Sequence, residues 1–154
     1  MNPEESLEYH EIELPRAPKA AGLYKPLLIH GGMAYFSGHL PLMPDGRMVT
    51  GLLGDSISLE EGAMAARLTG LNVLATVRES LGSLDRVERV IKLLGMVNAV
   101  PGFTQQPQVI NGCSELFRDV WGEDCGVGTR SAFGVSGLPA GACVEIEGVF
   151  SLRE

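Results

Sequence analysis

The chain lacks the sequence features that proteins use to bind nucleic acid or to enter a membrane. Only 12 of its 154 residues are Lys or Arg, against 19 Asp and Glu, which gives a formal charge of −7. The basic residues are scattered, whereas a protein that binds phosphate backbones normally carries a basic stripe. The acidic N-terminus has no apolar signal core, and no apolar run approaches membrane-spanning length. These absences predict a soluble, cytoplasmic protein without nucleic-acid or membrane partners.

Cysteine and histidine are equally scarce, with three of each. Cys113, Cys125 and Cys143 have no metal-ligand spacing, and an odd number leaves one unpaired in any disulfide scheme. Reduced thiols are therefore expected, as is usual inside the cell. The histidines show no spacing typical of a metal site or a catalytic triad. The sequence thus predicts no metal and no Ser/His or Cys/His nucleophile.

The chain does contain enough apolar sequence for one domain. Its 154 residues are 45% hydrophobic, which is typical of a globular protein that buries a core. Residues 1–22 are predicted as an N-terminal extension, because Pro3, Pro15 and Pro18 interrupt regular structure there. Within this extension, Tyr9–Leu14 is expected to form at most a short edge strand. Residues 23–154 are predicted as the single domain.

The expected elements of that domain follow one another as hairpin, helix, strand, helix, strand and strand. This order indicates an α+β fold in which one sheet carries both helices on one side. The signals are the Gly31-Gly32 turn of a hairpin over 27–37, a capping box of Ser58 and Glu61 that opens a helix ending at Gly82, β-branched residues over 87–100, Pro107 at the start of a helix to about Trp121, and apolar runs at 130–136 and 144–150.

The densest chemical pattern lies near the C-terminus. Arg130 opens a run whose alternate residues are small: Ala132, Gly134 and Ser136. Alternate residues of a strand share a face, so the Arg130 side chain projects among small neighbours. Glu145 and Glu147 likewise share a face of the following run. A charged face bordered by small residues leaves room for a small anion or for the surface of another subunit.

Several segments spread over residues 22–152 make the chain similar to the Rid family, the reactive-intermediate deaminases that are also called the YjgF family. They are, in order, Gly22-Leu23-Tyr24, FSGHLP (36–41), Gly70-Leu71-Asn72, GSLDRVERV (82–90), Val109-Ile110-Asn111 and RSAFGVSGLPAGACVEIEGVF (130–150), of which the last is the most specific. The resemblance implies a chorismate-mutase-like fold with a single mixed sheet, and a homotrimer with clefts between subunits. It also implies cofactor-independent hydrolysis of 2-imino or 2-enamino acids to 2-keto acids and ammonia.

The resemblance further implies a role for each matching residue. Arg130 would anchor the substrate carboxylate, because a planar guanidinium can hold both oxygens through parallel hydrogen bonds. Glu145 would position or activate the attacking water. The remaining substrate-binding positions are Tyr24, Ser37, Gly38, Asn111 and Ala132. At Ala132 several family members have cysteine, so this difference bears on substrate preference and rate.

The spacing of the two key residues limits how they can cooperate. If the last two runs paired as a tight hairpin, Glu145 would lie opposite Ser136, on the order of 20 Å from Arg130 along the strand. One small keto acid cannot touch both residues at that distance. Either the runs are not hairpin partners, or the pocket takes Arg130 from one chain and Glu145 from its neighbour. We favour the second arrangement, because the small face of Ala132 and Gly134 suits the close approach of another chain.

Two other functions stay open from sequence alone. The same Arg130 pocket would also serve a noncatalytic protein that binds or senses small carboxylates. Some relatives carry the label endoribonuclease, which the acidic charge and the lack of a basic groove or a histidine pair count against. Deamination is the function that the matching residues favour.

Overall fold

The computed structural model describes all 154 residues and contains one five-stranded mixed sheet with strand order β1-β2-β5-β3-β4. Only the β3–β4 pair is parallel, and the other neighbours are antiparallel. In chain order the elements are α1 (Pro3–Tyr9), β1 (Leu27–His30), β2 (Met33–His39), α2 (Leu59–Leu81), η1 (Leu84–Arg86), β3 (Val87–Asn98), α3 (Gln106–Cys125), β4 (Thr129–Val135), η2 (Pro139–Gly141) and β5 (Val144–Leu152).

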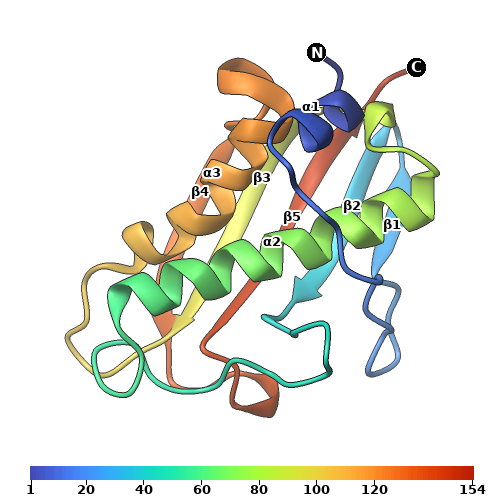
Figure 1. Cartoon of the computed structure of the whole chain (residues 1–154). Coiled ribbons are helices and arrows are strands. Elements are labelled where there is room, and N and C mark those ends of the chain that lie inside the picture. Colours follow the sequence, from blue (N-terminus) through green and yellow to red (C-terminus); the bar gives the residue numbers. More distant parts are fainter.

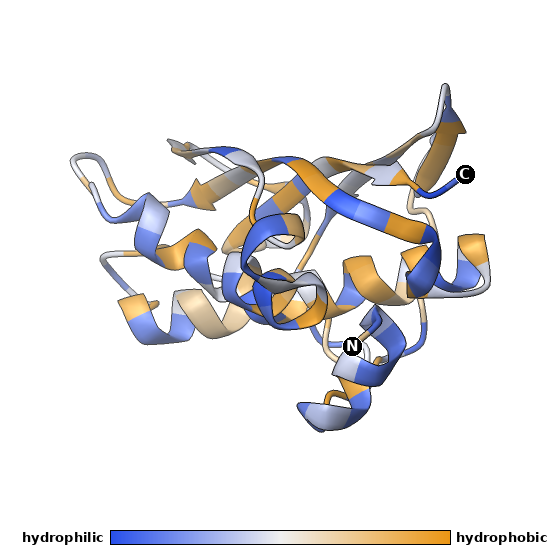
Figure 2. Cartoon of the chain, turned by 90° about the horizontal axis from the view of Figure 1, so that it is seen from above, coloured by the Kyte–Doolittle hydropathy of each residue, from blue (hydrophilic) through white to orange (hydrophobic).

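All helices lie on one face of this sheet, as the prediction of an α+β fold required. Figure 1 shows α2 and α3 in front of the strands, and Figure 2 shows the other face of the sheet without any helix over it. The core lies between the helices and the sheet, where the Phe150 ring stacks at 5.1 Å on Phe36 and packs at 5.6 Å against Phe117. The bare face is therefore the surface on which side chains from the middle strands remain accessible.

The helix boundaries follow from the signals in the sequence. Ser58 accepts a hydrogen bond from the Glu61 N–H while the Glu61 side chain accepts one from the Ser58 N–H, which is the predicted capping box of α2. Gly82 ends α2 with a φ of 86°, a conformation that glycine adopts without strain. The second long helix, α3, ends at Cys125, four residues beyond the predicted end at Trp121. It is kinked at Gly122. Both predicted helices are thus confirmed.

The N-terminal residues contain a helix, which the sequence analysis missed. Pro3–Tyr9 forms α1, so the predicted interruption at Pro3 and the edge strand over Tyr9–Leu14 are wrong. Asn2 and Glu5 form a capping box, and Pro3 occupies the first helical turn, where proline is favoured. Leu7 is buried in the core with 3% of its surface exposed.

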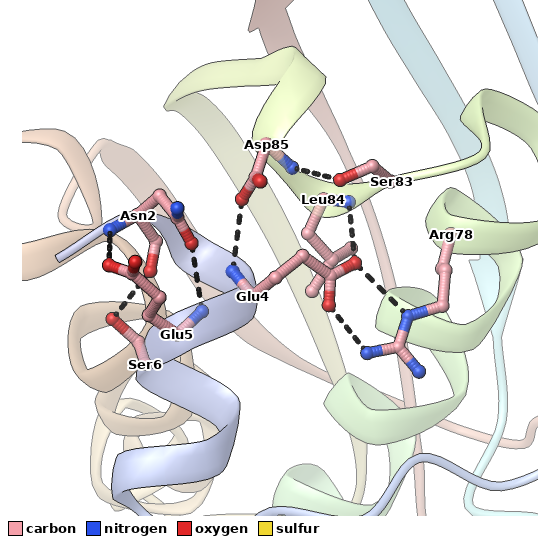
Figure 3. Close-up of polar contacts among 8 residues, drawn as sticks. All are labelled: Asn2, Glu4, Glu5, Ser6, Arg78, Ser83, Leu84 and Asp85. Carbon is pink, nitrogen blue, oxygen red and sulfur yellow. Dashed lines mark hydrogen bonds and ion pairs between the residues drawn. The ribbon is translucent and has the colours of Figure 1, made fainter.

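A polar network fastens α1 to the end of α2. The Glu4 carboxylate accepts hydrogen bonds from the Arg78 guanidinium at 2.6 and 3.2 Å and from the Leu84 N–H at 3.1 Å. Figure 3 shows this carboxylate between the two donors, with the Glu4 N–H in turn bonded to Asp85. These contacts hold the N-terminal residues against the domain.

The last two strands are not hairpin partners, because β3 lies between them. β4 pairs with β3 in parallel, and β5 pairs with the other side of β3. The small face of β4 is covered by α3 of the same chain: Ala132 packs against the core, and the side-chain amide of Gln106 lies over Gly134. The expectation that this small face receives a neighbouring chain is therefore wrong, since α3 already occupies it.

Candidate functional site

Arg130 lies in a cleft between α3 and the start of β4. The cleft has a volume of about 340 Å³ and is lined by Asn111, Ser114, Glu115, Arg118 and the backbone around Gly126–Thr129. One terminal nitrogen of Arg130 donates to Asn111 Oδ1 at 2.7 Å and to Ser114 Oγ at 3.0 Å. Both partners are neutral, and no carboxylate forms an ion pair with this guanidinium. Although Glu115 lines the same cleft, it makes no ion pair with Arg130, so the guanidinium keeps donors for an anionic ligand.

The fold explains why these three side chains meet. The parallel β3–β4 pairing places Arg130 level with Leu93, whose side chain is buried beneath the helices. Arg130 consequently projects toward α3, on which Asn111 and Ser114 are three residues apart and share a face. The sequence analysis identified Asn111 but not Ser114, although their helical spacing is a signal that would have found it.

A second group of predicted residues lies around an irregularity in β2. The β2–β5 register pairs Phe36 with Gly148 and His39 with Ile146, so Ser37 and Gly38 together oppose the single residue Glu147. Two residues against one is a β-bulge, a feature that re-aims side chains and is common beside active sites. Ser37 is fixed in this bulge, because its hydroxyl donates to the Lys25 carbonyl at 2.6 Å.

Glu145 lies directly against the bulge. A Cβ atom added at Gly38 would be 2.8 Å from the carboxyl carbon of Glu145, so only glycine leaves space for this carboxylate. Burial raises the pKa of Glu145 above its usual range, and the negative charge of Glu147 raises it further. A carboxylate that is half-buried, lacks a cationic partner and accepts protons more readily than usual has the properties of a general base.

His39 holds the bulge from the helix side. Its Nδ1 lies 2.6 Å from the Ser37 carbonyl, which can only accept, so Nδ1 carries the proton and donates. Its Nε2 lies 2.8 Å from the Thr76 hydroxyl of α2 and accepts from it in the neutral ring. Burial lowers the pKa of His39, which keeps the ring neutral. No local pattern predicts this role, since the Thr76 contact joins residues 37 positions apart in the chain.

Tyr24 and Gly38 line a pocket of about 240 Å³ together with His39, Leu40 and Leu42. The Tyr24 hydroxyl accepts a hydrogen bond from the Ala21 N–H at 3.1 Å, which fixes the chain before β1. Tyr24, Ser37, Gly38 and Glu145 thus form one group, and Arg130, Asn111 and Ala132 form the other.

The two groups do not meet within one chain. Arg130 is level with Leu93 on β3 and Glu145 with Met96, which puts their Cα atoms on the order of 14 Å apart across three strands. Their side chains also leave the sheet on opposite faces. Arg130 bonds to α3, whereas Glu145 alternates with Val144 and Ile146, both fully buried under the helices.

The cysteine, histidine and acidic side chains outside these two groups form no metal site and no activated nucleophile. No group of three or more His, Cys, Asp or Glu side chains is arranged to hold a metal ion. Burial raises the pKa of Cys113 to about 12 and that of Cys143 to about 11, so neither thiol is a ready nucleophile. None of the helices combines the length and the apolar character that a membrane crossing requires.

Comparison with known proteins places the chain in a family. A family model described as "YjgF/chorismate_mutase-like, putative endoribonuclease" matches residues 4–144. The chain is 43% identical over 142 residues to protein TCP17 of Trypanosoma cruzi. The aligned region covers 92% of this chain and 89% of TCP17. The chain therefore belongs to the YjgF/chorismate mutase-like family, as its resemblance to Rid proteins predicted.

Solved structures agree with this assignment. Protein Atu1372 of Agrobacterium tumefaciens, a protein of unknown function, superposes with a TM-score of 0.87 at 38% identity. The match covers 98% of this chain and 94% of the Atu1372 chain. Escherichia coli TdcF, solved with bound serine, superposes with a TM-score of 0.65 at 25% identity. The match covers 93% of this chain and 98% of the TdcF chain. The chorismate-mutase-like fold is thus confirmed.

Proposed function

We propose that the protein hydrolyses reactive 2-imino or 2-enamino acids to 2-keto acids and ammonia, with Arg130 as the carboxylate anchor and Glu145 as the group that activates water. The observation that carries the proposal is the unpaired Arg130 guanidinium, which neutral partners orient in an open cleft. Family membership and the serine bound to TdcF support a small carboxylate as the ligand.

The reaction asks for positioning more than for covalent chemistry. A protonated imine is already electrophilic at C2, so the site must hold its carboxylate, bring a water molecule to C2 and move protons. Glu145 takes a proton from the water molecule as the water oxygen bonds to C2. It then returns this proton to the nitrogen of the tetrahedral adduct, and ammonia leaves as the adduct hydroxyl loses its proton to form the 2-keto acid. An enamine is first protonated at C3 to give the imine. Holding the reactants accounts for much of the acceleration, and acid–base help adds about a hundredfold.

Arg130 and Glu145 act on one substrate in this proposal only if they come from different chains. The two side chains leave opposite faces of one sheet, so a site that uses both has to lie between subunits. The bare face of the sheet supports association, because the exposed side chains of Tyr35 and Phe133 alternate with core-facing residues and so lie on it. The homotrimer that the family resemblance implies is the assembly that we propose.

The test follows imine decay in wild type, Arg130→Ala and Glu145→Gln. 2-Aminoacrylate or 2-aminocrotonate is generated in situ, and the rate of its conversion to keto acid is measured. We expect each variant to lose at least a hundredfold in kcat/KM. Arg47→Ala is the matched control, because Arg47 is an exposed arginine that pairs with Asp45 and lines neither the Arg130 cleft nor the Tyr24 pocket, and it should keep wild-type activity. Equal rates in all four proteins would reject the proposal.

Noncatalytic binding of small carboxylates is the second candidate, favoured by the structure of TdcF with serine. Calorimetric titration with 2-keto acids separates it from catalysis. Binding that needs Arg130, together with no acceleration of imine decay, would select the binding protein. RNA cleavage that survives Arg130→Ala would point instead to another site or to contamination.

A further inference from the structure

A cleft that contains neither Arg130 nor Glu145 lies between the N-terminal residues and α2. In Figure 1 the chain after α1 crosses in front of α2 on its way to β1. Residues 15–19 form one wall of a cleft of about 450 Å³, the turn after β2 forms the other, and Asn72 of α2 completes the lining. At about 30 Å³ per water-sized group, the cleft has room for about 15 non-hydrogen atoms. It is thus large enough for a small organic molecule.

The Asn72 side chain leaves one acceptor free at this cleft. The residue is buried, with 2% of its surface exposed. Its amide nitrogen donates to the carbonyls of Leu40 and Leu42, both at 3.0 Å. Because a carbonyl only accepts, these two bonds fix the orientation of the amide and use both of its N–H groups. Oδ1 of Asn72 accepts no hydrogen bond from the chain, so it is free to accept one from a donor in the cleft.

Two cations without a counterion line the same cleft. Arg16 and Lys19 are exposed, and neither forms an ion pair. No acidic side chain lines the cleft, and the charge of the neighbouring Asp45 is already paired with Arg47 at 2.7 Å. In a chain with a net charge of −7, these two unpaired cations favour an anionic group at this place.

The other side chains of the cleft are apolar and come from rigid segments. They are Pro15, Ala17, Pro18, Leu42, Met43 and Pro44. Proline fixes its own φ, which stiffens both walls. The turn after β2 is also closed by hydrogen bonds, from the Met43 N–H to the Arg47 carbonyl at 2.8 Å and from the Gly46 N–H to the Met43 carbonyl at 2.9 Å. Preformed apolar walls with a few placed polar groups are typical of a small-molecule site.

We propose that this cleft binds a second ligand, apart from the imine site: a small organic anion that carries an N–H or O–H donor on an apolar body. The anion lies at Arg16 and Lys19, the apolar body lies between the proline-containing walls, and the donor bonds to Oδ1 of Asn72. Carboxylates and phosphates share this anionic chemistry. The inference goes beyond the proposed deaminase function, because none of these three residues takes part in that reaction.

The experiment uses 4-aminobenzoate as the probe, because it combines an anion, an apolar ring and an N–H donor. Benzoate lacks the donor and aniline lacks the anion. The donor is thus removed from the ligand, and Asn72, which holds the chain after β2, stays intact. NMR titration of the labelled protein measures each affinity and follows the signals of the Asn72 side-chain amide. We expect 4-aminobenzoate to shift these signals and to bind about 5-fold more tightly than benzoate and about 10-fold more tightly than aniline.

Variants test the two cations. Arg16→Gln/Lys19→Gln changes only exposed positions, so it should fold, and it should weaken the binding of 4-aminobenzoate about 10-fold. Arg67→Gln/Arg153→Gln is the matched control, because it removes the same charge from exposed positions that line none of these clefts. It should bind within about twofold of wild type. Arg130→Ala should also keep its affinity for the probe.

The outcomes separate this inference from the proposed function. Equal affinities for the three probes, unshifted Asn72 signals or full binding by Arg16→Gln/Lys19→Gln would overturn the second site. Loss of binding in Arg130→Ala would overturn it too, because the probe would then occupy the Arg130 cleft. A titration with 4-aminophenyl phosphate distinguishes the two anions, since the tighter binder at the Asn72 amide identifies the preferred one. A failure of imine hydrolysis changes none of these measurements.

Discussion

At the scale of single residues, the chemistry depends on an arginine whose charge is not neutralised by its own chain. Asn111 and Ser114 fix one nitrogen of Arg130 and leave its other donors for a ligand. A lysine at this position would present one point charge in place of a planar fork. It cannot hold both neutral partners and both carboxylate oxygens in the same geometry.

Arg130→Lys is therefore expected to lose at least about 10-fold in kcat/KM for imine hydrolysis. Arg118→Lys is the matched control, since Arg118 lines the same cleft but makes only a loose ion pair with Glu123 at 3.9 Å. That variant should stay within about threefold of wild type. Steady-state kinetics check both values, and near-normal activity in Arg130→Lys would mean that the anchor is misassigned.

The charged form of Glu145 lowers the stability of the fold, because its carboxylate is partly buried and poorly solvated. Its folded-state pKa is raised by burial and then by Glu147, so its contribution to stability is present at low pH and is lost as pH rises through the folded pKa. We expect Glu145→Gln to raise Tm at pH 7 and the difference from wild type to shrink near pH 4. Calorimetry measures both.

Glu147→Gln provides the comparison for this prediction. Removing the Glu147 charge lowers the repulsion on Glu145 but leaves the burial of Glu145 unchanged. The Tm of Glu147→Gln should therefore rise less than that of Glu145→Gln. A fall in Tm for Glu145→Gln at pH 7 would show that the carboxylate has a stabilising partner, which is inconsistent with a free general base.

At the scale of elements, α1 is a structural part of the domain. Hydrogen bonds from Arg78 lower the pKa of Glu4, and so does its bond from the Leu84 N–H, although burial acts in the other direction. Because the folded-state pKa is depressed, the stabilisation is present above the unfolded pKa and is lost as pH falls through the folded value.

Glu4→Gln should therefore lower the free energy of unfolding by about 1 kcal/mol at pH 7, a modest value because solvent screens this part-buried pair. The effect should fade as pH drops below about 4. Glu8→Gln, on an exposed position of the same helix, is the control and should have little effect. Urea unfolding at both pH values checks this, and an equal loss at pH 7 and pH 3 would contradict the role of the charge.

The elements that the sequence predicts well are those with local signals. The Ser58–Glu61 capping box, the Gly31-Gly32 turn and Pro107 each define a boundary through contacts within a few residues. α1 has such signals too, at Asn2 and Glu5, although the prolines at 3, 15 and 18 predict an interruption of regular structure there. The β-bulge at Ser37-Gly38 has none, because it exists only relative to the register of β5.

At the scale of the whole molecule, strand order decides which residues can meet. A sequence in which 130–136 precedes 144–150 suggests a hairpin, yet β3 is inserted between the two strands and pairs with both. Long-range pairing of this kind leaves no local signal in either strand. The sequence therefore suggested individual residues for the candidate site, whereas their actual spacing and their division between two faces of the sheet required the structure.

The central claim is that Arg130 and Glu145 of different chains act on one substrate, and subunit complementation tests it most directly. Arg130→Ala and Glu145→Gln are unfolded together, refolded as a mixture, and assayed for imine hydrolysis against each variant refolded alone. Random assembly of a cyclic trimer from equal amounts places an intact Arg130 opposite an intact Glu145 in about one quarter of the sites. Recovery of about one quarter of wild-type activity is the predicted result, and mixed assemblies that are as inactive as either variant alone would contradict the account.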